Sequence, residues 1–220
     1  MRGFSRASGT NQFENQLPAE EEIDNGLALF VRKKTLYHGS GISGIKVFNA
    51  AEEDTVGSGV YLTSEAKDAT GYARIRSKRE RFTHKADGSP VIKDSEPYLY
   101  ETSIENLKLC DLRKNENVKI VLEGFKEVLK EERKKPDIPW SWQGALDEII
   151  ETISNGKVGG GNLKEVGRRT GKMFSDYVES LGYAGLITLE GGEESVVGNH
   201  DTYLIFDPKK VRIEKEQKVS

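Results

Sequence analysis

The chain has 220 residues, which is enough for one well-buried domain with a tail and short for two full domains. Its 33 Lys and Arg residues nearly balance its 36 Asp and Glu residues, so the net charge of −3 gives no global field that would attract nucleic acid or an anionic membrane. There is no apolar run of about 18 residues and no apolar stretch typical of a signal peptide near the N-terminus, so the sequence predicts a cytoplasmic protein without membrane association.

The N-terminal segment divides into an arm and a predicted helix. Residues 1–20 are rich in Gly, Ser, Asn, Gln and Glu without a sustained period, which is typical of a flexible arm. In residues 20–32 the apolar side chains of Ile23, Leu27 and Phe30 recur at helical spacing and predict a short helix.

Strands and one helix are expected between this segment and residue 112. The pattern predicts strands at 34–40, 59–63, 98–103 and 107–112, a helix at 64–73, and a charged, exposed excursion at 76–95. The only cysteine, Cys110, lies in a strand-like apolar run, which favours a buried structural thiol over a nucleophile.

Helical periodicity dominates the following segment, and strands return at the end. Apolar residues recur every three to four positions over 118–129, 146–153 and 173–181, which predicts three helices, and Gly182 is suited to end the last one in the left-handed conformation. Strands are expected at 184–189 and 202–206, followed by a charged tail over 214–220. We therefore expect one catalytic domain over residues 21–213, of class α+β, with a helical insert at 116–181.

The first candidate site motif is His38-Gly39 at the end of the strand 34–40. A histidine there can present its ring to a ligand, and the missing glycine side chain lets that ligand approach the backbone amide and carbonyl. Alone, the motif also fits an ordinary histidine at a turn.

The second motif is a pair of tyrosines. Tyr61 ends the strand 59–63 and Tyr72 follows on the next helix, so the two rings can face each other across a slot for a flat heterocycle. Two aromatic residues at this spacing are also typical of a simple core, and the slot gains weight only beside His38-Gly39.

With these motifs the sequence resembles the ADP-ribosyltransferase superfamily, in its diphtheria-toxin-like and poly-ADP-ribose-polymerase-like branch. The resemblance rests on four blocks in order: Tyr37-His-Gly-Ser40, Gly57-Ser-Gly-Val-Tyr-Leu-Thr63 with Tyr72 beyond it, Tyr98-Leu-Tyr-Glu-Thr-Ser-Ile104 and Tyr203-Leu-Ile-Phe-Asp-Pro208. It implies a split pair of small, mostly antiparallel sheets around an NAD cleft, and leaves most of the helical segment unmatched.

The resemblance also implies roles for individual residues. His38 would hydrogen-bond the adenosine ribose, Gly39 would bind the nicotinamide carboxamide through its backbone, and Ser40 would contact ribose. Tyr61 and Tyr72 would enclose the nicotinamide ring. Gly59 and Thr63 of the second block are expected to line the NAD site. NAD is then a co-substrate whose ADP-ribose passes to an acceptor, without a metal.

The third signature position departs from the family. Thr202 stands where a glutamate usually polarises the ribose, and a threonine cannot carry that charge. We expect Asp201 to replace it, although in a regular strand its side chain points to the opposite face, so a bulge would be needed. Glu190, Glu193 and Glu194 are the alternatives. His200 shares the strand face of Thr202 and can line the same pocket.

The leading hypothesis is a mono-ADP-ribosyltransferase that acts on a macromolecular acceptor, protein or nucleic acid. By analogy with toxins and effectors of bacterial or phage origin, it would have an inhibitor or antitoxin partner. The alternatives are a module that binds NAD or ADP-ribose without turnover, and an NAD-using RNA 2′-phosphotransferase, for which the sequence lacks a set of arginines beside the pocket motifs.

Overall fold

The computed structural model describes residues 22–24, 26–51, 56–80, 83–84, 90–91, 96–155, 160–190 and 199–219. The predicted arm at 1–20 and the loop acids Glu193 and Glu194 lie outside these ranges.

The framework is a seven-stranded sheet in the order β1-β2-β3-β8-β7-β6-β9, in which β2 also pairs with β6. Strands β2, β3, β8, β7 and β6 therefore close into a barrel. All pairings in this sheet are antiparallel except that of β6 with β7.

The strands are β1 (Glu22–Asp24), β2 (Ala28–Ser40), β3 (Val60–Thr63), β6 (Tyr98–Asp111), β7 (Gly185–Glu190), β8 (His200–Ile205) and β9 (Arg212–Lys218), with a separate pair β4 (Thr83–His84) and β5 (Pro90–Val91). The class is α+β, but one sheet closed on itself takes the place of the expected split pair of sheets.

The helix predicted over 20–32 is wrong. The segment forms β1 and the beginning of β2, where Leu29 and Val31 are buried and Phe30 and Arg32 are exposed. This alternation has the period of a strand, because successive side chains point to opposite faces. The buried residues of β2 pack in the barrel with those of the other four strands.

Two further segments differ from the prediction. The strands expected at 98–103 and 107–112 are one strand, β6, which bends near Asn106 at a left-handed φ of 53°. Most of the expected charged tail forms the edge strand β9, whose side chains are largely exposed. An edge strand that faces solvent carries charged residues readily, so its composition resembles that of a tail.

Four helices form a lobe on the outer face of the barrel: α2 (Asn115–Arg133), α3 (Trp140–Ser154), α4 (Gly160–Thr170) and α5 (Lys172–Ser180). Their apolar stripes pack together with Leu186 of β7 and Leu204 of β8. Gly182 ends α5 at a φ of 85°, as predicted. The sequence did not predict α4, because only Leu163 and Val166 mark its buried side within a Gly-rich, charged segment.

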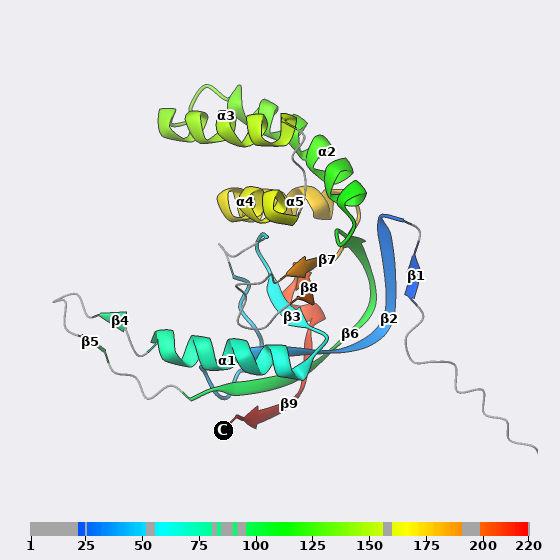
Figure 1. Ribbon diagram of the computed structural model, residues 1–220, viewed down its shortest axis with the longest axis vertical. Helices are drawn as coiled ribbons and strands as arrows, with labels where there is room; N and C mark the ends of the chain where they lie inside the picture. The colour runs from blue at the N-terminus through cyan, green and yellow to red at the C-terminus, as the bar shows by residue number, and fades with distance from the viewer. Residues whose placement is uncertain are drawn as a thin grey trace, which may run out of the picture.

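Helix α1 (Ala66–Glu80) lies apart from this lobe. In Figure 1 the lobe is above, α1 is below, and β3, β7 and β8 lie between them. The first part of the expected excursion at 76–95 therefore belongs to a helix. In the described part of the chain, no helix is long and apolar enough to span a membrane.

Helix α1 lies very close to β2 at Gly39. A Cβ atom on Gly39 would lie 1.9 Å from the carbonyl oxygen of Ala69 and 2.6 Å from the amide nitrogen of Ala73. The glycine is thus needed for contact between helix and strand, a different reason from the ligand approach expected from the sequence.

Candidate functional site

A cavity of about 230 Å³ lies where α1 faces strands β2, β3, β7 and β8. Six residues expected from the sequence line it: His38, Gly39, Tyr61, Thr63, Tyr72 and Thr202. Glu190, an alternative acid in the sequence analysis, and His200, expected on the face of Thr202, also line it, and the structure adds Tyr37, Arg76 and apolar side chains. Segments far apart in the chain therefore contribute to one cavity.

His38 bridges a gap between two strands of the barrel. Strands β2 and β3 pair only at Tyr37 and Thr63, and beyond that point the His38 ring donates from Nδ1 to the carbonyl oxygen of Tyr61 at 2.8 Å. A carbonyl only accepts, so Nδ1 carries the proton and Nε2 is the acceptor nitrogen of the neutral ring. The ring also packs on Phe48, with centroids 4.7 Å apart.

His38 is uncharged at neutral pH. Burial lowers its pKa to about 4, opposed by the hydrogen bond to the Tyr61 carbonyl and reinforced by the charge of Arg76. A neutral imidazole with an acceptor Nε2 is suited to take a hydrogen bond from a hydroxyl group. This chemistry fits a sugar ligand.

Tyr61 is held by the hydrogen bonds of its hydroxyl group. Its hydroxyl accepts from the amides of Val56 and Gly57 at 2.9 and 3.1 Å and donates to the carbonyl of Gly57 at 2.8 Å. The ring packs against the core of the helical lobe and also lines the cavity. It is therefore a rigid aromatic wall.

Tyr72 lines the cavity from α1 and contacts two buried titratable residues. Its hydroxyl lies 3.4 Å from Glu190 Oε2 and 3.2 Å from His200 Nε2. Glu190 and His200 are opposite each other in the β7–β8 ladder, and their residues are only 8% and 5% exposed. The tyrosine hydroxyl thus connects an acid and an imidazole from neighbouring strands.

Thr202 contributes a buried hydroxyl group to the cavity. It is 3% exposed, lies opposite Thr63 on β3, and its Oγ1 makes no hydrogen bond within the described part of the chain. A buried hydroxyl without a partner costs about 1–3 kcal/mol. Because Thr202 lines the cavity, a ligand can supply the missing hydrogen bond.

Arg76 brings positive charge to the cavity. Arg76 follows Tyr72 by one helical turn on α1 and is exposed to solvent. Its positive charge lowers the pKa of His38. The guanidinium is therefore at the solvent side of the cavity, where a phosphate group would be accessible to it.

Three expected site residues lie elsewhere. Asp201 is in an ion pair with Arg113 at 2.9 Å and does not line the cavity, because its side chain takes the face of β8 opposite to that of His200 and Thr202. The Ser40 hydroxyl accepts from the amide of Ile42 at 3.0 Å. Gly59 packs against β8, where a Cβ would lie 2.6 Å from the carbonyl oxygen of Ile205.

Sequence reasoning weighed Glu190 and His200 but ranked neither first. The expectation that His200 shares a face with Thr202 is confirmed. Arg76 was missed as a site residue, although its spacing of four from Tyr72 places both on one helix face. Cys110 is buried, as predicted, and burial raises the pKa of its thiol to about 12, which disfavours the reactive thiolate.

No protein-family model and no curated protein matches the chain. Among solved structures, one chain of the M. tuberculosis MbcT–MbcA toxin–antitoxin complex is similar to this protein. The alignment covers 86% of this chain and 85% of that chain, at 11% sequence identity and a TM-score of 0.39. A similarity at this level carries no inference about function, so the function is argued from the cavity.

Proposed function

We propose that the protein is an NAD-dependent mono-ADP-ribosyltransferase that moves ADP-ribose from NAD to a macromolecular acceptor. The observation that supports this most is the meeting of His38, Tyr61 and Tyr72 in one cavity with the carboxylate of Glu190 and the hydroxyl of Thr202, which makes no hydrogen bond among the described residues.

The two sides of the cavity suit the two parts of a nicotinamide riboside group. The rings of Tyr61 and Tyr72 provide flat apolar surfaces for the nicotinamide ring, and the backbone of Gly39 is available to its carboxamide. The neutral His38 accepts a hydrogen bond from a ribose hydroxyl at Nε2, and Thr202 Oγ1 offers a second one.

The reaction requires cleavage of the bond between ribose C1′ and the nicotinamide nitrogen. The bonding electron pair stays with nicotinamide, which leaves as a neutral molecule, and positive charge develops on the ribose. A carboxylate beside that charge stabilises it, and a buried site makes the effect larger than in water. Glu190 is the only carboxylate among the described residues that line the cavity. It takes over the role that the sequence first suggested for Asp201.

A module that binds NAD without turnover is the second candidate, and Thr202 at the third signature position is the observation that favours it. A neutral threonine can still hold the ligand by a hydrogen bond, but it stabilises the charged ribose less than a glutamate does. The two functions therefore differ in turnover rather than in affinity.

The test incubates the purified protein with NAD labelled in the adenylate group, with and without cell lysate. Transfer predicts nicotinamide release together with label attached covalently to protein or nucleic acid, which mass spectrometry then locates. Nicotinamide release without attached label would identify a hydrolase. NAD binding by calorimetry without nicotinamide release would identify a binding module. Absence of binding would refute the NAD site.

A further inference from the structure

The imidazole of His38 packs against two aromatic side chains that do not themselves line the cavity. Phe48 lies in the segment after β2, and Tyr100 lies directly opposite His38 in the β2–β6 ladder. The ring centroid of His38 is 4.7 Å from that of Phe48 and 6.5 Å from that of Tyr100, and the latter two are 5.8 Å apart. Phe48 is 5% exposed and Tyr100 is fully buried. The three rings therefore contact one another in a triangle behind the cavity wall.

Tyr100 also holds the segment that carries Phe48. Its hydroxyl donates to the carbonyl of Ile42 at 2.7 Å and accepts from the amide of Ile45 at 3.3 Å. Residues 41–48 contain neither a helix nor a strand, so bonds from side chains determine where this segment lies. The position of Phe48 over the imidazole thus depends on the Tyr100 hydroxyl.

The orientation of an imidazole is not fixed by its own covalent bonds. Rotation about the bond to the ring is broad and roughly two-fold, and turning the ring over exchanges nitrogen and carbon positions. In His38 the hydrogen bond from Nδ1 to Tyr61 selects one orientation. The rings of Phe48 and Tyr100 restrict the plane in which that bond forms. Nε2 makes no hydrogen bond within the described part of the chain, so its lone pair is left for a ligand.

We propose that Phe48 and Tyr100 are positioning residues of the NAD site, which hold the His38 ring in the orientation and tautomer that accept a hydrogen bond from a ligand hydroxyl. This inference rests on the proposed function. Because neither residue lines the cavity, both act on NAD only through His38. An acceptor that is already oriented loses little conformational freedom when the ligand binds, which favours affinity.

The same two rings help to keep the imidazole neutral. Burial lowers the pKa of His38 to about 4, because apolar surroundings disfavour the charged form, and Phe48 and Tyr100 supply part of these surroundings. A charged imidazole carries a proton on both nitrogen atoms and has no acceptor. His38 therefore offers an acceptor nitrogen at neutral pH.

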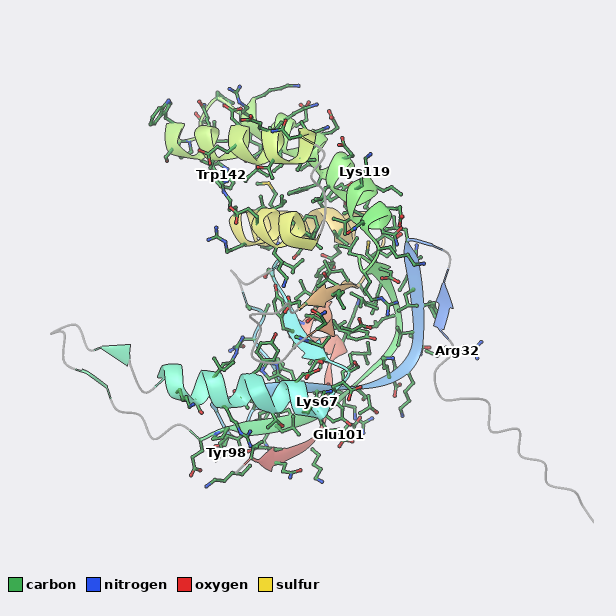
Figure 2. The ribbon with its side chains drawn as sticks, in the orientation of Figure 1. Arg32, Lys67, Tyr98, Glu101, Lys119 and Trp142 are labelled. Atoms are coloured by element: carbon green, nitrogen blue, oxygen red, sulfur yellow. The ribbon has the colours of Figure 1, made fainter. Side chains whose placement is uncertain are left out.

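Four purified variants test the proposal. Phe48→Leu keeps an apolar side chain and removes the ring. Tyr100→Phe keeps the ring and removes the hydroxyl group that holds the neighbouring segment. His38→Ala removes the imidazole itself. Tyr98→Phe is the matched control, because Tyr98 lies near the start of the same strand, β6, and its hydroxyl bonds to Glu96 Oε2 at 3.2 Å (Figure 2).

The first measurement needs no ligand. Nitrogen-15 NMR at neutral pH reports which ring nitrogen carries the proton, and the signals of His38 are those absent from the His38→Ala spectrum. The wild type and the control should show one tautomer, protonated at Nδ1. Phe48→Leu should show a mixture of both tautomers. Tyr100→Phe should show a smaller change, because the amide of Gly44 still anchors the segment by its bond to Glu216 Oε2 at 2.9 Å.

The second measurement is the Kd of NAD by calorimetric titration. Phe48→Leu should raise it by about 10-fold, as expected for the loss of one hydrogen bond. In the His38→Ala background the same substitution should change the Kd by less than about 2-fold, because no imidazole is left to position. A residue that only supports the fold would weaken NAD binding in both backgrounds.

A single tautomer in both Phe48→Leu and Tyr100→Phe would overturn the positioning role while the transferase stands, as would a mixture of tautomers in the wild type. An equal rise in the Kd with and without His38 would also overturn it. If Phe48→Leu does not fold, as judged by circular dichroism, Tyr100→Phe decides, and if His38→Ala binds no NAD, the tautomers decide. If the wild type has the single tautomer but does not bind NAD, the proposed function fails, and the assignment of both residues to an NAD site fails with it.

Discussion

Arg113 holds Asp201 by an ion pair of 2.9 Å between Nη1 and Oδ2, and the same guanidinium binds the buried carboxylate of Asp111 through two further nitrogen atoms. Asp111 is 1% exposed and also accepts from the amide of Arg113. The pKa of Arg113 is raised, mainly by its hydrogen bonds to Asp111. The acid that the sequence favoured for catalysis therefore belongs to a cluster that connects β6 with β8.

The first prediction separates these two aspartates. Asp201→Asn leaves the bidentate pair of Arg113 and Asp111 in place, and we expect a loss of about 1 kcal/mol or less in the free energy of unfolding. Asp111→Asn leaves a partly buried guanidinium without its main partner and should cost about 3 kcal/mol or more. Urea denaturation measures both. A larger loss in Asp201→Asn than in Asp111→Asn would contradict the order.

The second prediction concerns the pH dependence of stability at His38. Its folded-state pKa of about 4 is below the ordinary value of 6.5, so between these values the unfolded chain binds more protons than the folded one. The free energy of unfolding should therefore decrease as the pH falls from 6.5 towards 4. His38→Gln should have a flatter profile in urea denaturation at a series of pH values. Parallel profiles for the two proteins would refute the lowered pKa.

The third prediction separates the ring of Tyr61 from its hydroxyl. Tyr61→Phe keeps the aromatic wall but leaves the amides of Val56 and Gly57 without their acceptor, so it should lower thermal stability and keep NAD affinity. Tyr61→Ala removes the wall and should lower NAD affinity by 10-fold or more, on the order of 1.4 kcal/mol. Differential scanning fluorimetry and calorimetric titration distinguish the two. Equal NAD affinity in both variants would remove Tyr61 from the site.

The fourth prediction is that Gly39→Ala displaces α1. The new methyl group would overlap the backbone of Ala69 and Ala73, which cannot move without shifting the helix that carries Tyr72 and Arg76. We expect a fall in both melting temperature and NAD binding. Gly144→Ala in α3 is the matched control, because its Cβ would have no neighbour within 4 Å, and it should be neutral or slightly stabilising. Normal NAD binding in Gly39→Ala would show that α1 tolerates the displacement.

Local patterns predicted the segments in which one periodicity dominates. The amphipathic helices around Phe125 and Phe174 and the strand that carries His38 follow from their apolar spacing. The helix expected at 20–32 failed because Ile23, Leu27 and Phe30 fit a helical period by chance, while Leu29 and Val31 carried the strand alternation.

The part of the site that was predicted is the part carried by sequence motifs. His38, Tyr61 and Tyr72 belong to the blocks that carry the family resemblance, and all three line the cavity. The alternation of β8 already turned Asp201 away from the face of His200 and Thr202, whereas the place of Glu190 depended on the β7–β8 register, which sets Glu190 opposite His200 and is contained in no local pattern. A change of one residue in that register would reverse which acid faces the cavity.

The last prediction assigns Arg76 to the diphosphate of NAD. It is the only lysine or arginine among the described residues that line the cavity, and it is exposed to solvent. A guanidinium binds phosphate oxygens with two parallel hydrogen bonds, so its loss should weaken NAD more than a ligand without phosphate. Arg76→Gln should therefore raise the Kd of NAD by about 10-fold, on the order of 1.4 kcal/mol, and leave that of nicotinamide riboside nearly unchanged.

Arg74→Gln, on the exposed side of the same helix, is the matched control for the loss of one positive charge. Calorimetric titration at two salt concentrations also shows whether the NAD affinity of the wild type falls with salt and that of Arg76→Gln falls less. Equal weakening of NAD and nicotinamide riboside would mean that Arg76 supports the cavity wall, whereas equal weakening of NAD by both variants would reduce its role to general charge.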